Sequence, residues 1–304
     1  MAAWNELLNE AQATGSTQDI LRRKYLRRLS QHTKRNTIIY YSGWLQKPHL
    51  QHEAAVQLGI SDSDKNGFMS AIHQLDRRKG LDLILHTPGG DMAATESIVD
   101  YLRAMFGTDI RAVIPQLAMS GGTIMALSCA EIIMGKGSSI GPIDPQFGAT
   151  AATNLLQEFA TAREEIRRDP SAALLWQPIL QQIAPGFISH CKNALEWSHE
   201  MGDRFLRTNM FADDKEADDR ISKILRHLTE SETTKHHGRH ISPDEATEVF
   251  GNKVRRLEED QKLQDLVLTV HHSTMITLQS TSCYKIVEND KGKAYMQVAA
   301  MNVV

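Results

Sequence analysis

Two kinds of apolar pattern alternate along the first half of the chain. Nearly continuous apolar runs occupy residues 37–43, 81–86 and 109–114, and such runs are typical of strands buried on both faces of a parallel sheet. In the intervening segments 61–75 and 91–106, apolar residues recur every three or four positions, which predicts amphipathic helices. Because strands and helices alternate, we expect right-handed βαβ crossovers and an α/β fold.

The pattern changes after residue 147. Helical periodicity now dominates, in segments 154–168, 172–183, 188–210 and 215–228. The predicted sheet does not obviously need these helices as cover, so we expect them to form an arm, a lid or an oligomer surface. The sequence thus predicts four parts: an N-terminal helical segment 1–35, an α/β core 36–150, a helical arm or lid 151–230, and a C-terminal completion of the domain 231–304.

Local signals near the two ends predict further elements. Residues 242–245, Ser-Pro-Asp-Glu, form a capping box with proline at the first helical position. An apolar helix is expected at 263–279, followed by a hairpin of 284–287 with 294–298. Near the N-terminus, the basic run 22–28 predicts one face of a helix.

Two glycine-containing turns follow neighbouring strands of the predicted sheet. Residues 87–91, Thr-Pro-Gly-Gly-Asp, follow the first strand of the pair, and residues 118–123, Ala-Met-Ser-Gly-Gly-Thr, follow the second. Each turn opens a helix, where unpaired backbone N–H groups and the helix dipole favour negative charge. The two turns therefore place one hydroxyl where an acyl group could be attacked and its oxyanion held.

This order of turns resembles the Clp protease and crotonase superfamily. Within it, the chain is most similar to the proteinase family named for degrading serine dehydrogenase, a relative of the signal peptide peptidases. The segments 131–134 and 140–146 fit the same family, and the resemblance extends from about Asn36 to Phe147. It implies a Clp protease/crotonase-like parallel sheet of βαβ units with a helical extension.

The resemblance also implies roles for three residues. Ser120 would be the nucleophile, and the backbone N–H groups of Gly90 and Gly121 would form the oxyanion hole. The chemistry agrees, because an unactivated serine is a poor nucleophile and the tetrahedral intermediate needs donors aimed at its negative charge. We therefore expect a serine endopeptidase that hydrolyses a peptide or protein substrate through an acyl-enzyme.

Other interpretations of the same turns stay open. A crotonase-like enzyme would use the two N–H donors on an acyl-CoA thioester and would need no serine nucleophile. A non-catalytic member of the fold would bind peptides or a partner subunit. A small-Ser-Gly-Gly turn can also serve only to let a helix pack closely on a sheet.

The general base is the least defined part of the predicted site. In Clp proteases a histidine follows the serine by roughly two dozen residues, but the corresponding stretch 140–147 contains no histidine, and Asp144 falls there. Signal peptide peptidases instead use a lysine from a later helix, which must be neutral to accept a proton. Lys192 is therefore the first choice for the base, with Asp144 and His190 as alternatives. A lysine on a helix can equally be a solvated surface charge.

A competing serine motif lies in segment 137–141, which matches Gly-x-Ser-x-Gly. In α/β-hydrolases this motif leads from a strand directly into a helix. Pro142 and Pro145 disfavour a regular helix here, so we interpret the segment as a loop.

Two histidine-containing segments resemble metal sites. Segment 199–203 has two of the ligands of a zincin motif, but no candidate for the third, and we interpret it as a polar helix face. Segment 236–240, His-His-Gly-Arg-His, could bind a metal, yet its polar surroundings favour a solvated loop. One of its histidines could still approach the active site in an oligomer. We expect no metal and no cofactor, and the chain lacks the phosphate-binding loop that a built-in ATPase of that kind would need.

Composition limits the binding partners and the cellular compartment that we expect for the predicted enzyme. The formal net charge of −3 argues against general nucleic-acid binding. Three widely spaced cysteines, Cys129, Cys191 and Cys283, indicate a reducing compartment and no disulfide framework. The N-terminus lacks the pattern of a signal peptide, and the uncharged stretch 112–130 is better explained by a strand, turn and helix than by a membrane span.

These observations favour a cytoplasmic enzyme without stable membrane insertion. Apolar residues recur at helical spacing in 174–183 and need a partner surface, either in the chain's own core or in a neighbouring subunit. We expect a closed homo-oligomer whose assembly restricts access to Ser120.

Overall fold

The computed structural model describes residues 18–53, 55–148, 150–229 and 236–299. Its centre is a seven-stranded sheet with the order β11-β10-β1-β2-β3-β5-β9. The strands are β1 (Asn36–Ser42), β2 (Leu81–His86), β3 (Ile110–Ile114), β5 (Glu131–Met134), β9 (Val254–Arg256), β10 (Cys283–Asn289) and β11 (Ala294–Val298). The first five run parallel, whereas β10 is antiparallel to β1 and to β11. The α/β fold with a largely parallel sheet is therefore confirmed.

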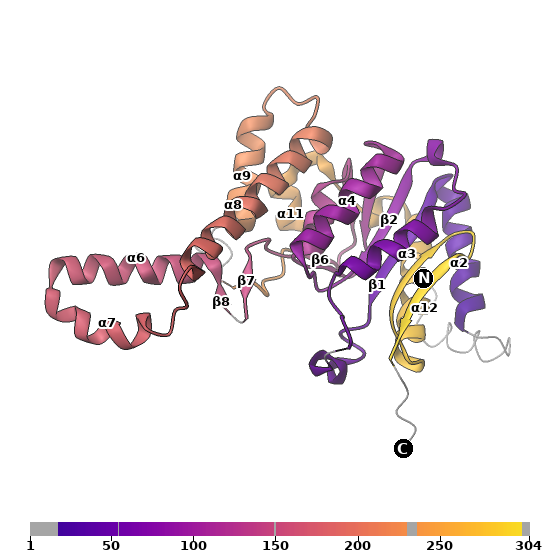
Figure 1. The fold of residues 1–304 in the computed structure, drawn as a ribbon. Coiled ribbons are helices and arrows are strands. Elements are labelled where there is room, and N and C mark those ends of the chain that lie inside the picture. The colour runs from indigo at the N-terminus through magenta and orange to yellow at the C-terminus, as the bar shows by residue number, and fades with distance from the viewer. Residues whose placement is uncertain (1–17, 54, 149, 230–235, 300–304) are drawn as a thin grey trace, which may run out of the picture.

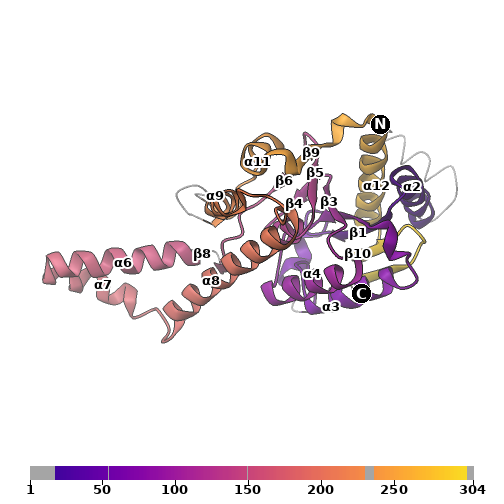
Figure 2. The ribbon, with the colours of Figure 1, turned by 90° about the horizontal axis from the view of Figure 1, so that it is seen from above.

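Helices cover both faces of this sheet (Figures 1 and 2). Both faces need cover because successive residues of β2 point to opposite sides of the sheet: Leu83 belongs to one apolar cluster and Ile84 to the other. The first cluster includes residues of α3 (Asp62–Ile72), α4 (Met92–Phe106), α5 (Gly121–Leu127), α9 (Ala217–Thr229) and α11 (Pro243–Phe250). The second includes residues of α2 (Gln18–Thr33) and α12 (Gln261–Ser280). The predicted apolar helix near the C-terminus and the hairpin that follows it are both confirmed as α12 and β10–β11.

The uncharged stretch 112–130 is part of this core. It contributes β3, the short strand β4 (Leu117–Ala118) and α5, as the sequence predicts. A second short strand, β6 (Ser139–Ile140), pairs with β4. No regular helix follows β6, so segment 137–141 does not have the strand-to-helix turn of an α/β-hydrolase.

An arm of two helices extends from the body (Figures 1 and 2). It consists of α6 (Ala152–Arg168) and α7 (Ala173–Leu180), and α8 (Phe187–Phe205) leads back to the body. The last turns of α8 are anchored there, because Met201 and Phe205 are buried in the core and the Ser198 hydroxyl donates to the Ile143 carbonyl at 2.7 Å. The predicted helix 188–210 thus ends at Phe205 and continues as a single wider turn to Met210.

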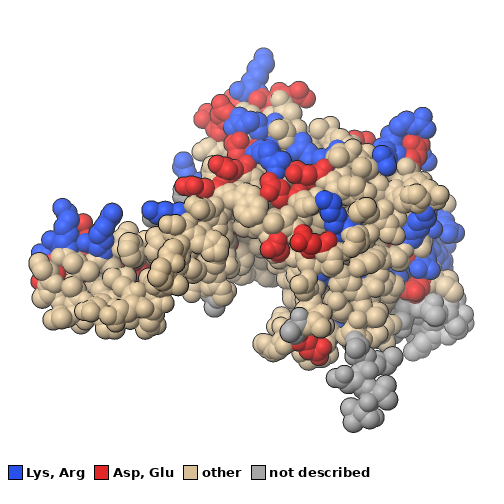
Figure 3. Space-filling model, viewed as in Figure 1, with Lys and Arg blue, Asp and Glu red and all other residues tan. Residues whose placement is uncertain are grey.

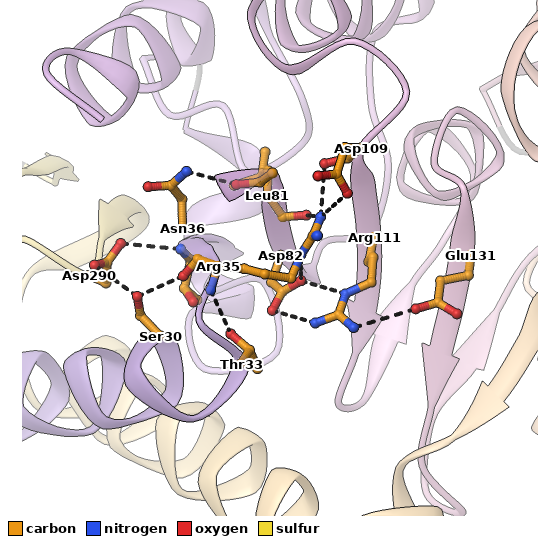
Figure 4. Close-up of polar contacts among 12 residues, drawn as sticks. Ser30, Thr33, Arg35, Asn36, Leu81, Asp82, Asp109, Arg111, Glu131 and Asp290 are labelled. Carbon is orange, nitrogen blue, oxygen red and sulfur yellow. Dashed lines mark hydrogen bonds and ion pairs between the residues drawn. The ribbon is translucent and has the colours of Figure 1, made fainter. Parts of the chain in front are cut away.

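Charged side chains tie together the amino ends of the central strands (Figure 4). Asp82 on β2 is almost fully buried and accepts hydrogen bonds from Arg35, at 2.9 Å, and from Arg111 on β3, at 2.7 and 2.8 Å. Arg111 also lies 3.6 Å from Glu131 on β5. The network fixes neighbouring strands at the edge of the sheet opposite to the two glycine-containing turns, which follow the carboxyl ends.

The basic run of the N-terminal segment lies on α2, as predicted. Arg22 from this run is completely buried and pairs with the buried carboxylate of Glu288 on β10. Its guanidinium also donates to the Thr277 hydroxyl at 2.7 Å on α12. This residue therefore connects α2 to the sheet and to its neighbouring helix.

Candidate active site

Ser120 occupies a strained turn between β4 and α5. Its φ of 49° and ψ of −114° lie in a region that residues with a side chain rarely adopt. Two glycines follow because there is no room for a Cβ atom: one on Gly121 would lie 2.7 Å from the Thr95 hydroxyl, and one on Gly122 would lie 2.5 Å from Thr87 Cγ2. The turn thus holds the serine at the start of a helix that is fully buried.

The turn after β2 contacts the serine turn directly. A Cβ atom on Gly89 would lie 2.6 Å from the Cβ of Ser120 and 2.9 Å from the Gly121 nitrogen, so only glycine fits at this position, where φ is 93°. The two segments also pair through a bridge in which the Met119 nitrogen donates to the Thr87 carbonyl at 3.0 Å.

Gly90 and Gly121 lie close together beside Ser120. A Cβ atom built on Gly121 would lie 3.5 Å from the Gly90 nitrogen, which shows how close the two glycines are. Gly121 is the first residue of α5, so its N–H has no acceptor within the helix. The bridge between Gly90 and Ile60 uses the Gly89 carbonyl and the Asp91 nitrogen, which leaves the Gly90 N–H available. This geometry can hold an oxyanion.

Ser120 opens into a cleft of about 730 Å³, called the Ser120 cleft below. Its walls come from the glycine turns, from the segment 143–148 and from α8. Apolar side chains line it, including Ile124, Ile143, Phe147 and Trp197. The polar side chains at its edge include His190 and His237.

His237 is held by a buried carboxylate. Its Nδ1 lies 2.8 Å from Oδ1 of Asp144, and the other oxygen of Asp144 accepts from Gln146 Nε2 at 2.8 Å. The Asp144 side chain is only 2% exposed, whereas that of His237 is 26% exposed. Because an ionised carboxylate can only accept, the ring proton belongs on Nδ1, and Nε2 is left as a proton acceptor. Ser120 and His237 thus line the same cleft, and Asp144 holds the imidazole from behind.

Comparisons with known proteins identify the family of the chain. A family model described as ClpP-like SDH-type serine proteinase matches residues 7–192. The chain belongs to this family. Two curated relatives come from Methanocaldococcus jannaschii: "Uncharacterized protein MJ0137", 35% identical over 138 residues, and "Uncharacterized protein MJ1495", 36% identical over 107 residues. These matches cover 45% and 35% of this chain, and 47% and 36% of the relatives, so the chain spans about half or less of their length.

The three base candidates predicted from the sequence lie in different places. Lys192 is exposed on α8 and is not part of the cleft wall. His190, two residues earlier, lines the cleft and packs its ring against Phe147, with the ring centroids 4.8 Å apart. Asp144 is buried behind His237, where it can orient the imidazole.

His237 was missed by the sequence reasoning. Segment 236–240 was expected to be a solvated loop, and His236 and His240 are indeed exposed. His237 differs because Asp144, 93 residues away in the sequence, holds its ring at the cleft. The sequence signals were the concentration of histidines in segment 236–240, one of which was expected to approach the active site only in an oligomer, and the lack of a histidine in segment 140–147.

Neither of the two histidine segments forms a metal centre within the part of the chain that the structure describes, where no group of three or more His, Cys, Asp or Glu side chains could hold an ion. His199 is exposed on α8. Over the same residues, none of the helices has both the length and the apolar character needed to cross a bilayer.

A second hollow lies on the other side of the Pro88–Asp91 turn. It has a volume of about 470 Å³ and is lined by Trp44, Leu58 and Ser61, among others. Pro88 and Asp91 border both this hollow and the Ser120 cleft. An extended ligand passing Ser120 could therefore reach both spaces.

His86 lies at the base of the same turn and is completely buried. Its ring stacks on Trp44, with the centroids 4.4 Å apart, and contacts the rings of Tyr41 and His271. Neither ring nitrogen has a hydrogen-bond partner among the described residues. Burial disfavours the charged imidazolium and lowers the pKa of His86 to about 3. The side chain is therefore neutral at physiological pH.

Proposed function

We propose that this chain is a serine endopeptidase in which Ser120 is the nucleophile, His237 the general base and Asp144 the residue that orients His237. The observation that carries the proposal is that Ser120 and His237 line one cleft while a buried carboxylate fixes the imidazole. Membership of the ClpP-like SDH-type serine proteinases supports the peptidase activity, and His237 lies beyond the matched residues 7–192. His237 replaces Lys192, the base expected from the sequence, because Lys192 lies outside the cleft wall.

The proposed reaction has two halves. Ser120 Oγ attacks the peptide carbonyl carbon while its proton moves to His237 Nε2, and the resulting oxyanion is held by the N–H groups of Gly90 and Gly121. The C–N bond then breaks as His237 returns the proton to the leaving amine. A water molecule, deprotonated by His237, hydrolyses the acyl-enzyme and regenerates the Ser120 hydroxyl.

The proposed triad closes when substrate binds. The Ser120 side chain does not cap α5, so its hydroxyl is free to turn towards His237 Nε2 when a substrate is bound. Catalytic hydrogen bonds are often long before substrate binds and tighten in the complex. The apolar wall formed by Ile124, Ile143 and Phe147 favours a substrate with an apolar side chain next to the scissile bond.

The proposed assembly is a homo-oligomer joined through the arm. Leu174 and Leu175 on α7 are 76% and 77% exposed, and Ile179 on the same helix is 44% exposed. Figure 3 shows charged side chains along the upper side of the arm and an uncharged underside. Large apolar side chains on a projecting helix gain most by packing on another copy of the same surface, which a closed symmetric oligomer provides. Because α8 carries both the arm and part of the cleft wall, such an assembly would limit access to Ser120.

Trapping of the acyl-enzyme tests the peptidase proposal. Purified protein incubated with an activated peptide ester should gain the mass of the acyl group on Ser120, as intact-protein and peptide mass spectrometry can show. Ser120→Ala should gain none and should lose peptide hydrolysis by at least about 10³-fold. Ser139→Ala, in the competing Gly-x-Ser-x-Gly segment, is the matched control and should behave as the wild type. Thioester turnover that survives Ser120→Ala would favour the crotonase-like alternative, and no reaction with either substrate class would favour a binding role.

A further inference from the structure

The turn that carries the Gly90 N–H is hydrogen-bonded to Ile60, the central residue of segment 59–61. The Ile60 nitrogen donates to the Gly89 carbonyl at 2.7 Å, and the Asp91 nitrogen donates to the Ile60 carbonyl at 2.9 Å. These two bonds flank Gly90 on either side. The contact is tight, because a Cβ atom on Gly90 would lie 2.1 Å from the Ile60 nitrogen. The position of the Gly90 N–H therefore depends on the position of segment 59–61.

A buried lysine, Lys285, holds segment 59–61 in place. Lys285 extends from β10, and its Nζ donates to the Gly59 carbonyl at 2.7 Å. The same ammonium lies 3.0 Å from Asp64, and the two side chains are 1% and 0% exposed. Lys285 is not among the residues that line the Ser120 cleft. It is a charged group placed in the core without contact to the reacting atoms.

Asp64 binds the same segment from its other end. Its carboxylate accepts from the Ser61 nitrogen at 2.9 Å and from the Tyr40 hydroxyl at 2.7 Å. Gln297 of β11 adds a longer contact of 3.2 Å. Lys285 and Asp64 together therefore fix both Gly59 and Ser61, the residues on either side of Ile60.

We propose that Lys285 and Asp64 are positioning residues that set the Gly90 N–H of the oxyanion hole through segment 59–61. The inference rests on the proposed function, because it assigns a role within that same site. A buried ion pair is a costly way to gain stability, but it fixes geometry because neither charge can shift without losing its partner. Oxyanion stabilisation needs such fixed geometry, since donors act only when they already point at the developing charge.

The first test replaces the lysine and follows kcat and KM separately. Lys285→Met keeps the length of the side chain but removes the donor to Gly59, so kcat for peptide hydrolysis should fall about 10–100-fold while KM changes less than about threefold. Arg22→Met is the matched control, because Arg22 also forms a fully buried ion pair with a residue of β10, Glu288. It should lower stability and leave kcat of the folded protein within about twofold.

Two further variants keep the test decisive if Lys285→Met fails to fold. The double variant Lys285→Met/Asp64→Asn removes both charges, so that no unpaired carboxylate is buried, and it should show the same loss of kcat. Gly59→Ala leaves the ion pair intact but places a Cβ atom 3.0 Å from the Gly89 carbonyl oxygen, which must shift the turn. It should also lower kcat with little effect on KM.

A structural measurement separates failure of this inference from failure of the proposed function. Amide hydrogen exchange in residues 87–92 should become at least about tenfold faster in Lys285→Met and stay unchanged in Arg22→Met, whether or not the protein cleaves peptides. An active wild type together with a fully active, folded double variant would overturn the positioning role. An inactive wild type with faster exchange in Lys285→Met would refute the peptidase proposal and leave the coupling of Lys285 to the turn in place.

Discussion

Acid should destabilise this protein through His86. The imidazole is completely buried, and its pKa is lowered to about 3 by burial, whereas an unfolded chain would protonate it near 6.5. At pH values between these two pKa values, the unfolded state therefore binds a proton at His86 that the folded state does not bind. The contribution of the neutral, buried His86 to the free energy of unfolding is fully present above pH 6.5 and is lost progressively as the pH falls towards 3.

The size of this effect follows from the two pKa values. At pH 5 the unfolded histidine is almost fully protonated and the folded one is almost fully neutral, which corresponds to about 2 kcal/mol of lost free energy of unfolding. His271 is also buried, and its pKa is lowered as well, so the wild-type loss should exceed the share of His86. Removing His86 should make stability less dependent on pH.

Urea denaturation at pH 7 and pH 5 measures this. In His86→Leu, the drop in the free energy of unfolding between the two pH values should be smaller than in the wild type by about 2 kcal/mol. At pH 7 the variant should lose little stability, because neither ring nitrogen of His86 has a hydrogen-bond partner among the described residues. His49→Ala, at an exposed histidine, should keep the wild-type drop. An equal drop in wild type and His86→Leu would refute the reasoning.

Three further substitutions probe other parts of the account. Asp144→Asn should lower kcat about 10³–10⁴-fold with the fold intact, measured by peptide hydrolysis and circular dichroism, because the amide no longer fixes the proton on His237 Nδ1. Leu174→Asp combined with Leu175→Asp should reduce the mass seen by light scattering, since it charges the apolar face of the arm; an unchanged mass would place the interface elsewhere. Arg111→Ala should cost about 2 kcal/mol in urea denaturation without changing kcat, because it weakens the network at the opposite edge of the sheet.

Much of the fold was predictable because its signals are local. The apolar runs of β1, β2 and β3 and the helices between them could be identified from neighbouring residues alone. The burial of Arg22 could not, since it depends on Glu288, which is 266 residues away in the sequence. A basic residue on a helix usually remains in solvent, and only the packed structure reveals a buried partner.

The candidate site likewise contains residues that local signals in the sequence predict and residues that they do not. Gly90, Ser120 and Gly121 belong to turns that come after predicted strands, so parallel pairing of those strands brings them to one edge of the sheet. His237 lies beyond the arm in a polar segment, and no periodicity connects it to Asp144. Lys192 is a lysine on a helix that follows the serine in the chain, as the resemblance led us to expect. It faces solvent, however, because α8 presents a different side to the cleft.

The rate at which a fluorophosphonate labels Ser120 tests the central claim most directly, because it measures activation of the serine without requiring a known substrate. The second-order rate constant should fall at least about 100-fold in His237→Gln and remain at the wild-type value in Lys192→Met. Ser120→Ala should not be labelled at all. A His237→Gln protein that is labelled as fast as the wild type, together with a Lys192→Met protein that is not labelled, would contradict the account and return the base to Lys192.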